Sequence, residues 1–200
     1  MLQSRDDRAG PPPVPVDEGE LEQRRLIVRI AAGELRAFEQ LYRSYHARLG
    51  RFLDRVTRRR ALVDEVLNDT MLVVWNRADR FDGSSKVSTW IFAIAYRKAL
   101  KALLRHDEAV EDDSRDDRVS PDAGPEQQTA SREAGARLLR ALDALSADHR
   151  AVVELTYFHG MGYREVAQIV ACPVDTVKTR MFHARRRLRA LLADAGEAGR

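Results

Sequence analysis

Apolar residues recur at three- and four-residue steps along most of this chain, which is the spacing of one buried helix face. In the first half, the pattern predicts a pair of helices within about 22–57, and Gly33 marks the break between them. Further helices are expected over about 62–78 and 88–105. No long stretch alternates apolar and polar residues as a half-buried strand would, so the expected fold class is all-α.

The second half resumes the helical pattern near Ala134, and Ser146 is placed to cap one of its helices. Residues 163–192 predict a helix, a tight turn and a second helix. Cys172-Pro173 interrupts the pattern, because proline disfavours helix in the residue before it and suits the first turn of a new helix. This is the arrangement of a helix-turn-helix, whose second helix enters the major groove of DNA.

Between the two halves lies a stretch with two prolines and almost no large apolar side chains, which is typical of a flexible acidic linker. The prediction is therefore two small helical domains joined by that linker. The expected divisions are an N-terminal tail at 1–21, a first domain at 22–106, the linker at 107–133, a second domain at 134–193 and a C-terminal tail at 194–200.

The net charge of +3 conceals strong segregation along the chain. Residues 24–105 hold 18 basic and 8 acidic side chains, and residues 134–200 hold 11 and 7. Residues 106–133, between them, hold 3 basic and 10 acidic side chains. Two basic blocks separated by an acidic block suggest two modules that bind a polyanion.

Composition excludes several classes of protein. One cysteine, Cys172, excludes an intramolecular disulfide framework and a cysteine zinc cluster, and the histidines lack ligand spacing. We expect no metal, no cofactor and no enzymatic activity, because no nucleophile-and-base pair, paired carboxylates or glycine-rich phosphate loop is evident. No apolar run reaches the roughly 20 residues of a membrane span, and no secretion signal is seen, so we expect a cytoplasmic protein without membrane insertion.

Three helix faces carry candidate chemistry. The last helix holds six cations against one acid, Asp175, which favours binding of duplex DNA. The 88–105 helix, which Ser88 or Thr89 should cap, carries aromatic and basic residues suited to stacking unpaired bases, although Trp90 could instead be core. The 62–78 helix has an acidic stripe, which by itself could be only a solvated face.

Both blocks resemble a known family. FEQLYRSYHARLGRFL, VDEVLNDTMLVVW and RFDGSSKVSTWIFAIAYRKALKALLR in the first block, with LSADHRAVVELTYFHGMGYREVA and DTVKTRMFHARRRLRALL in the second, are similar to group-IV (extracytoplasmic-function, ECF) sigma factors of the bacterial sigma-70 family. The chain departs from the family pattern at Lys86, Val87, Arg97 and Gly162, and glycine is a tolerable N-cap at the last of these.

The resemblance implies promoter-specific transcription initiation and a set of site residues. It assigns binding of core polymerase to Asp64, Glu65, Asn68 and Asp69. It assigns the −10 element to Lys86, Trp90, Tyr96, Arg97, Lys98 and Lys101, with a pocket for a flipped base expected at the 82–88 loop. It assigns the −35 element to Lys178, Thr179, Arg180, Phe182, His183, Arg185 and Arg186.

The implied partners are promoter DNA, core RNA polymerase (the clamp helices of its largest subunit and the flap of its second-largest subunit) and an anti-sigma factor. The alternative hypothesis is a stand-alone helix-turn-helix regulator that does not dock on polymerase. A regulator of that kind would need neither the acidic stripe nor the aromatic and basic helix, and both are present.

Overall fold

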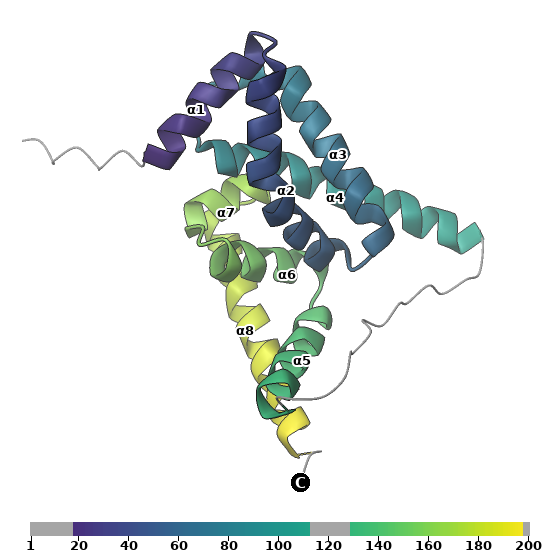
Figure 1. Cartoon of the computed structure of the whole chain (residues 1–200). Helices are drawn as coiled ribbons and strands as arrows, with labels where there is room; N and C mark the ends of the chain where they lie inside the picture. The colour runs from purple at the N-terminus through teal and green to yellow at the C-terminus, as the bar shows by residue number, and fades with distance from the viewer. Residues whose placement is uncertain (1–17, 113–128, 198–200) are drawn as a thin grey trace, which may run out of the picture.

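A computed structural model describes residues 18–112 and 129–197, and every element within these ranges is helical (Figure 1). The elements are α1 (Glu18–Ala31), α2 (Leu35–Thr57), α3 (Arg60–Arg77), the 3-10 turn η1 (Ala78–Arg80), α4 (Val87–Asp112), α5 (Thr129–Asp143), α6 (Ala147–Val153), the π-helical turn η2 (Glu154–Phe158), α7 (Tyr163–Ile169) and α8 (Val174–Glu197).

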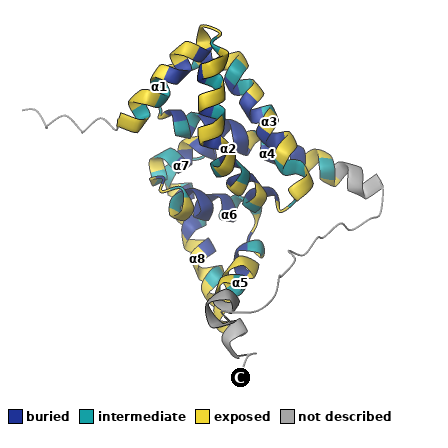
Figure 2. Cartoon of the chain, viewed as in Figure 1, coloured by how far each residue is buried: buried dark blue, intermediate teal, exposed yellow. Residues whose placement is uncertain are grey.

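The first four helices form a bundle in which α2 packs against α1, α3 and α4. The buried side of α2 repeats at helical spacing, and Leu41, Tyr45, Leu49 and Phe52 are at most 1% exposed. Gly33 lies at φ +85° between α1 and α2, a conformation that glycine adopts without the cost a side chain would add, so the predicted break is confirmed. Figure 2 shows buried residues, in dark blue, gathered where α2, α3 and α4 meet.

The start of α4 differs from the expected one. The helix begins at Val87, so neither Ser88 nor Thr89 caps it. Instead, the backbone N–H of Val87 donates to the Glu20 carboxylate of α1, at 3.0 Å to Oε1. An acid at a helix N-terminus satisfies a free N–H and complements the helix dipole, here from a position 67 residues earlier in the chain.

The C-terminal helices follow the predicted helix-turn-helix. Ser146 caps α6 by accepting from the His149 N–H, as expected. Gly162 caps α7, and its N–H donates to the Glu165 carboxylate at 2.9 Å. In the turn before α8, Ala171 takes φ +52°, a left-handed conformation that is costly for a residue with a Cβ.

Helical structure extends into both ends of the segment expected to be a linker. α4 continues to Asp112, and α5 begins at Thr129. The acidic stretch at 113–128, the expected N-terminal tail up to residue 17 and the last three residues lie outside the described ranges.

The two halves of the chain are in direct contact. α7 packs against α4, while α6 and η2 pack against α2 (Figure 1). Their buried apolar residues form one cluster that includes Phe92 of α4 and Val166 of α7. We call this arrangement the docked form.

Candidate nucleic-acid and polymerase interfaces

The helix α8 divides sharply into a buried side and an exposed side. Val177, Met181 and Ala184 are at most 1% exposed and hold α8 against the rest of the C-terminal half. The residues assigned to the −35 element lie on the rest of its surface. Lys178, Thr179, Phe182, His183, Arg185 and Arg186 are exposed, and Arg180 is half-buried. Phe182 is 63% exposed, which is unusual for a phenylalanine and leaves its ring available to a ligand.

Several of these side chains already have partners within the chain. Lys178 Nζ lies 2.9 Å from the Asp175 carboxylate. Arg185 Nε donates to the Tyr157 hydroxyl at 3.0 Å, and its guanidinium lies 5.6 Å from the Tyr157 ring centroid. Such exposed contacts contribute little stability, so they orient the cations without preventing them from binding phosphate.

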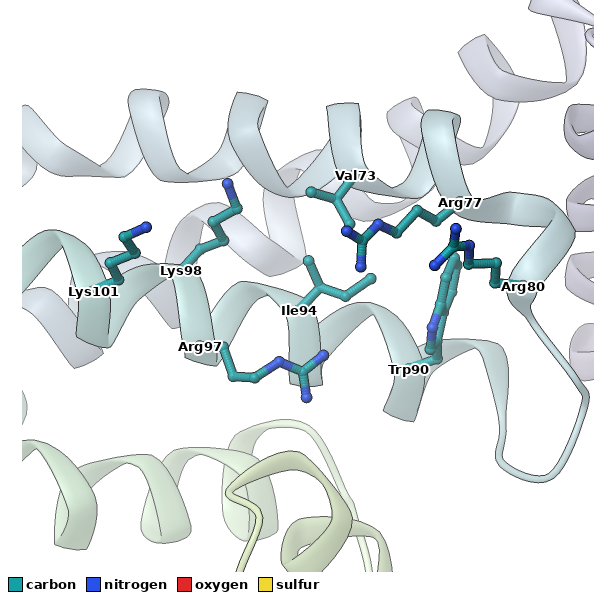
Figure 3. A pocket seen from close by; sticks show the side chains of 8 residues that line it. All are labelled: Val73, Arg77, Arg80, Trp90, Ile94, Arg97, Lys98 and Lys101. Carbon is teal, nitrogen blue, oxygen red and sulfur yellow. The ribbon is translucent and has the colours of Figure 1, made fainter.

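A cationic cleft lies between α3 and α4, with a volume of about 410 Å³. Val73 and Ile94 form its apolar part, and Trp90 closes one end (Figure 3). The remaining lining residues are all cations: Arg77, Arg80, Arg97, Lys98 and Lys101. Arg77 projects from α3 toward α4, whereas Lys98 projects from α4 toward α3.

The cleft brings together four residues assigned to the −10 element and adds two that the sequence analysis missed. Trp90, Arg97, Lys98 and Lys101 were assigned from the sequence, whereas Arg77 and Arg80 were not. Arg77 is the last residue of α3 and Arg80 the last residue of η1, directly before the loop where we had expected the pocket. The described cleft lies beside that loop, between the two helices.

Tyr96 does not lie where a strand-binding residue was expected. Its side chain is 3% exposed, and its hydroxyl donates to the Asp148 carboxylate of α6 at 2.8 Å. Burial, followed by the hydrogen bond and charge of Asp148, raises the pKa of Tyr96 well above its usual range. Lys86 also meets the C-terminal half, with Nζ 2.9 Å from Glu165 Oε1. In the docked form, therefore, two of the assigned −10 residues contact α6 and α7.

The acidic face of α3 is present but partly neutralised. Asp64, Glu65 and Asn68 are exposed, whereas Asp69 is half-buried. Asp69 lies 2.9 Å from Lys98 Nζ, and Glu65 lies 3.3 Å from the Arg105 guanidinium. Asn68 accepts from the Tyr42 hydroxyl at 3.3 Å.

An exposed leucine adjoins this acidic face. Leu72 is 57% exposed and follows Asn68 by four residues, one helical turn along the same side of α3. The sequence analysis did not single it out, because it lies outside the apolar positions of the buried face. An apolar side chain surrounded by polar ones is typical of a protein-binding surface.

Two features are absent from the described residues, a membrane-spanning helix and a cluster of metal ligands. No described helix is both long and apolar enough to cross a membrane. Within the described ranges, no three His, Cys, Asp or Glu side chains gather as metal ligands would.

Comparison with known protein families gives two matches, one in each half of the chain. The model of sigma-70 region 2 matches residues 41–109, and the model of sigma-70 region 4 matches residues 135–188. The first covers the cleft and the acidic face, and the second covers most of α8.

Individual proteins similar to this chain belong to the same family as these two matches. The ECF RNA polymerase sigma factor SigK of Mycobacterium ulcerans is 30% identical over 171 residues, covering 84% of this chain and 91% of that protein. The ECF RNA polymerase sigma factor RpoE of Cereibacter sphaeroides is 33% identical over 156 residues, covering 76% and 84%. Among solved structures, the sigma factor RpoE of Bartonella quintana, in complex with the anti-sigma factor NepR, has a TM-score of 0.66 and 25% identity, covering 80% of this chain and 98% of that one. The chain therefore belongs to the ECF sigma factors of the sigma-70 family, which direct promoter-specific initiation by RNA polymerase.

Proposed function

We propose that this sigma factor divides its work among three surfaces: α3 docks on core polymerase, the cleft binds the −10 strand, and α8 reads the −35 duplex. The observation that carries the proposal is the exposed side of α8, where cations, a threonine and a phenylalanine lie opposite three fully buried apolar residues. The chain would work in the cytoplasm, where promoter DNA and polymerase are found, and without catalytic activity of its own.

On α8, bases and phosphates are contacted by different residues. Lys178, Thr179, Phe182 and His183 share one side of the helix and are assigned to base edges, while the arginines are assigned to phosphates. Base contacts discriminate between sequences, whereas phosphate contacts strengthen binding to all sequences and make it salt-dependent.

The test is binding to a panel of −35 duplex variants at several salt concentrations. Lys178→Ala should relax discrimination at one base pair, by roughly 1–3 kcal/mol. Arg186→Ala should weaken every sequence about equally and lower the salt slope by about one unit. A uniform loss for Lys178→Ala across the panel would mean that the bases meet a different side of α8.

In the cleft, Trp90 offers a ring on which an unpaired base can stack, and the five cations that line the cleft are available for the strand's phosphates. Stacking of a base on an aromatic side chain is worth about 1–3 kcal/mol. Trp90→Ala should therefore reduce permanganate reactivity of thymines near the start site while −35 duplex binding stays intact. Arg77→Gln should weaken strand capture in the same direction, because it removes one lining cation.

On α3, the proposed surface for the clamp helices consists of the acidic side chains and Leu72. Buried apolar anchors supply most of the energy of an interface, while charged rims mainly steer association. Leu72→Ala should weaken capture of core polymerase, and Asp64→Lys should slow its association most at low salt. The matched control for Asp64→Lys is Glu39→Lys on α2, which reverses the charge of another exposed carboxylate, one that pairs with Arg43 at 2.6 Å. Equal capture by Leu72→Ala and Glu39→Lys would remove α3 from the interface.

Two further partners follow from family resemblance. The resemblance to sigma factors implies that the C-terminal domain contacts the flap of the second-largest polymerase subunit. The solved complex of the Bartonella quintana sigma factor with NepR supports an anti-sigma factor as a second partner of this chain. Affinity purification of the full chain from its own host tests both. Recovery of duplex DNA binding without any polymerase subunit would instead favour the stand-alone regulator.

A further inference from the structure

We propose that Arg24 of α1 is a positioning residue for recognition of the −10 strand. It fixes the 81–85 loop and, through Phe81, the ring of Trp90 at the end of the cleft. The inference deepens the proposed function of the cleft and rests on it. Arg24 lies outside residues 41–109, the part of the chain that matches sigma-70 region 2, so the proposed role extends recognition of the strand to α1.

The backbone of the loop is held by the guanidinium of Arg24. Arg24 Nη2 donates to the Gly83 carbonyl at 3.2 Å and to the Ser85 carbonyl at 3.0 Å. These acceptors lie 59 and 61 residues further along the chain. A charged donor makes stronger hydrogen bonds than a neutral one. One side chain of α1 therefore orients two peptide groups of the loop that leads into α4.

The shape of the loop fits this guanidinium closely. Gly83 lies at φ +72°, a left-handed conformation that glycine adopts without strain. A Cβ added at Gly83 would lie 2.9 Å from Arg24 Nη1, so Arg24 would have to give up its contacts to make room for it. Within the loop, Asp82 Oδ1 accepts from the Ser84 N–H at 2.9 Å and from the Ser84 hydroxyl at 2.7 Å. The loop conformation is therefore stabilised both by its own side chains and by Arg24.

Arg24 is itself held in place by Glu20, one helical turn earlier in α1. Arg24 Nε donates to Glu20 Oε1 at 2.8 Å, and the same oxygen accepts from the Val87 N–H at 3.0 Å. Val87 is the first residue of α4, and Trp90 lies one helical turn after it. The ion pair of α1 therefore fixes both the loop and the first turn of the helix that carries Trp90.

A row of rings connects Arg24 to the cleft. The Arg24 guanidinium carbon lies 5.8 Å from the centroid of the Phe81 ring, and the Phe81 and Trp90 centroids are 5.3 Å apart at an interplanar angle of 50°. Trp90 closes the end of the cleft (Figure 3). A ring that stacks an unpaired base must be held within about 0.5 Å and 10–20° of its productive position. Arg24 thus supports, from α1, the ring on which the base is proposed to stack.

The first measurement follows the Trp90 ring in the full chain. The sequence has two tryptophans, so Trp75→Phe leaves Trp90 as the only one. In this background, Arg24→Ala should shift the Trp90 emission to longer wavelength and increase its quenching by acrylamide, because the ring loses its fixed surroundings. Arg25→Ala is the matched control, since it removes an exposed arginine from the same turn of α1, and it should leave both quantities unchanged.

The second measurement is the choice of bases by the full chain bound to core polymerase. The probe is a pool of single-stranded DNA oligonucleotides with a randomised window, sequenced after binding. Loss of a charge-assisted hydrogen bond changes an equilibrium roughly tenfold, so Arg24→Ala should reduce discrimination at one or two positions of the enriched motif by roughly five- to tenfold. A residue that only stabilises the fold would weaken all sequences equally. Gly83→Ala, which displaces the guanidinium from the side of the loop, should shift both measurements in the same direction as Arg24→Ala.

The outcomes separate the positioning role from the function of the cleft. Equal emission and quenching for Arg24→Ala, Gly83→Ala and Arg25→Ala would overturn the positioning role. A displaced Trp90 ring with unchanged base preferences would overturn the link to recognition. If Trp90→Ala itself leaves the base preferences unchanged, the assignment of the −10 strand to the cleft is wrong, and the fluorescence of Arg24→Ala alone then decides whether α1 positions the loop.

Discussion

Glu20 connects three parts of the N-terminal half. Its replacement by alanine should lower the free energy of unfolding more than its position in the first turn of α1 suggests. Its carboxylate accepts from the Val87 N–H through both oxygens, at 3.0 and 3.2 Å, and pairs with Arg24 at 2.8 Å. Arg24 in turn donates to the carbonyls of Gly83 and Ser85, at 3.2 and 3.0 Å. The side chain of Glu20 is 12% exposed, so water replaces these contacts poorly.

The magnitude follows from the separate contacts. Loss of a helix cap costs about 1 kcal/mol, and removal of a charge from a helix N-terminus costs about 0.3–1 kcal/mol more. The half-exposed pair with Arg24 adds at most about 1 kcal/mol. We expect Glu20→Ala to lower the free energy of unfolding by about 2 kcal/mol, measured by urea titration of the full chain.

Glu22→Ala is the matched control on the same helix. Glu22 pairs only loosely with Arg25, at 3.5 Å, and both side chains are about half exposed or more. Its loss should change the free energy of unfolding by less than about 0.5 kcal/mol. Equal losses for Glu20→Ala and Glu22→Ala would refute the reasoning that α1 caps α4.

Two further predictions concern the C-terminal half. Ala171→Gly should raise the free energy of unfolding by about 0.5–1 kcal/mol in the same titration, because it relieves the left-handed backbone at φ +52°; no gain would mean that the turn relaxes by another route. Burial, then the charges of Arg48 and Arg51 on α2, lower the pKa of His159 to about 4 in the docked form. Because a free imidazole titrates near 6.5, docking should be fully present above that pH and weaken as the pH falls toward 4. Small-angle X-ray scattering between pH 7.5 and 5.5 should show expansion of the wild type and not of His159→Phe.

Local signals in the sequence were enough for most of the helices. Gly33 separates α1 from α2, Ser146 caps α6, and Pro173 directly precedes α8, each as its backbone chemistry predicts. The buried side of α8 follows the same spacing rule, with Val177 and Met181 inside. These features depend on neighbours within a few residues, which a sequence displays directly.

Contacts between distant residues could not be predicted in the same way. The cap of α4 comes from Glu20, far away along the chain, and no local pattern marks it. The burial of Tyr96 depends on Asp148 of the other half. His159, which contacts Phe92 of α4, directly follows a π-helical turn that no residue spacing indicated.

The cleft was only half predicted for a related reason. The aromatic and basic residues of α4 were visible as a cluster, because they lie on one helix. Arg77 and Arg80 belong to the end of α3 and η1, and only the packing of α3 on α4 brings them to the same cleft.

The most direct test of the account is transcription in vitro from the host's genomic DNA with purified core polymerase, with and without the full chain. The account predicts new start sites that share paired −35 and −10 motifs, with starts lost for Trp90→Ala and redistributed toward altered −35 motifs for Lys178→Ala. An unchanged set of start sites on addition of the wild-type chain, despite its capture of core polymerase, would contradict it.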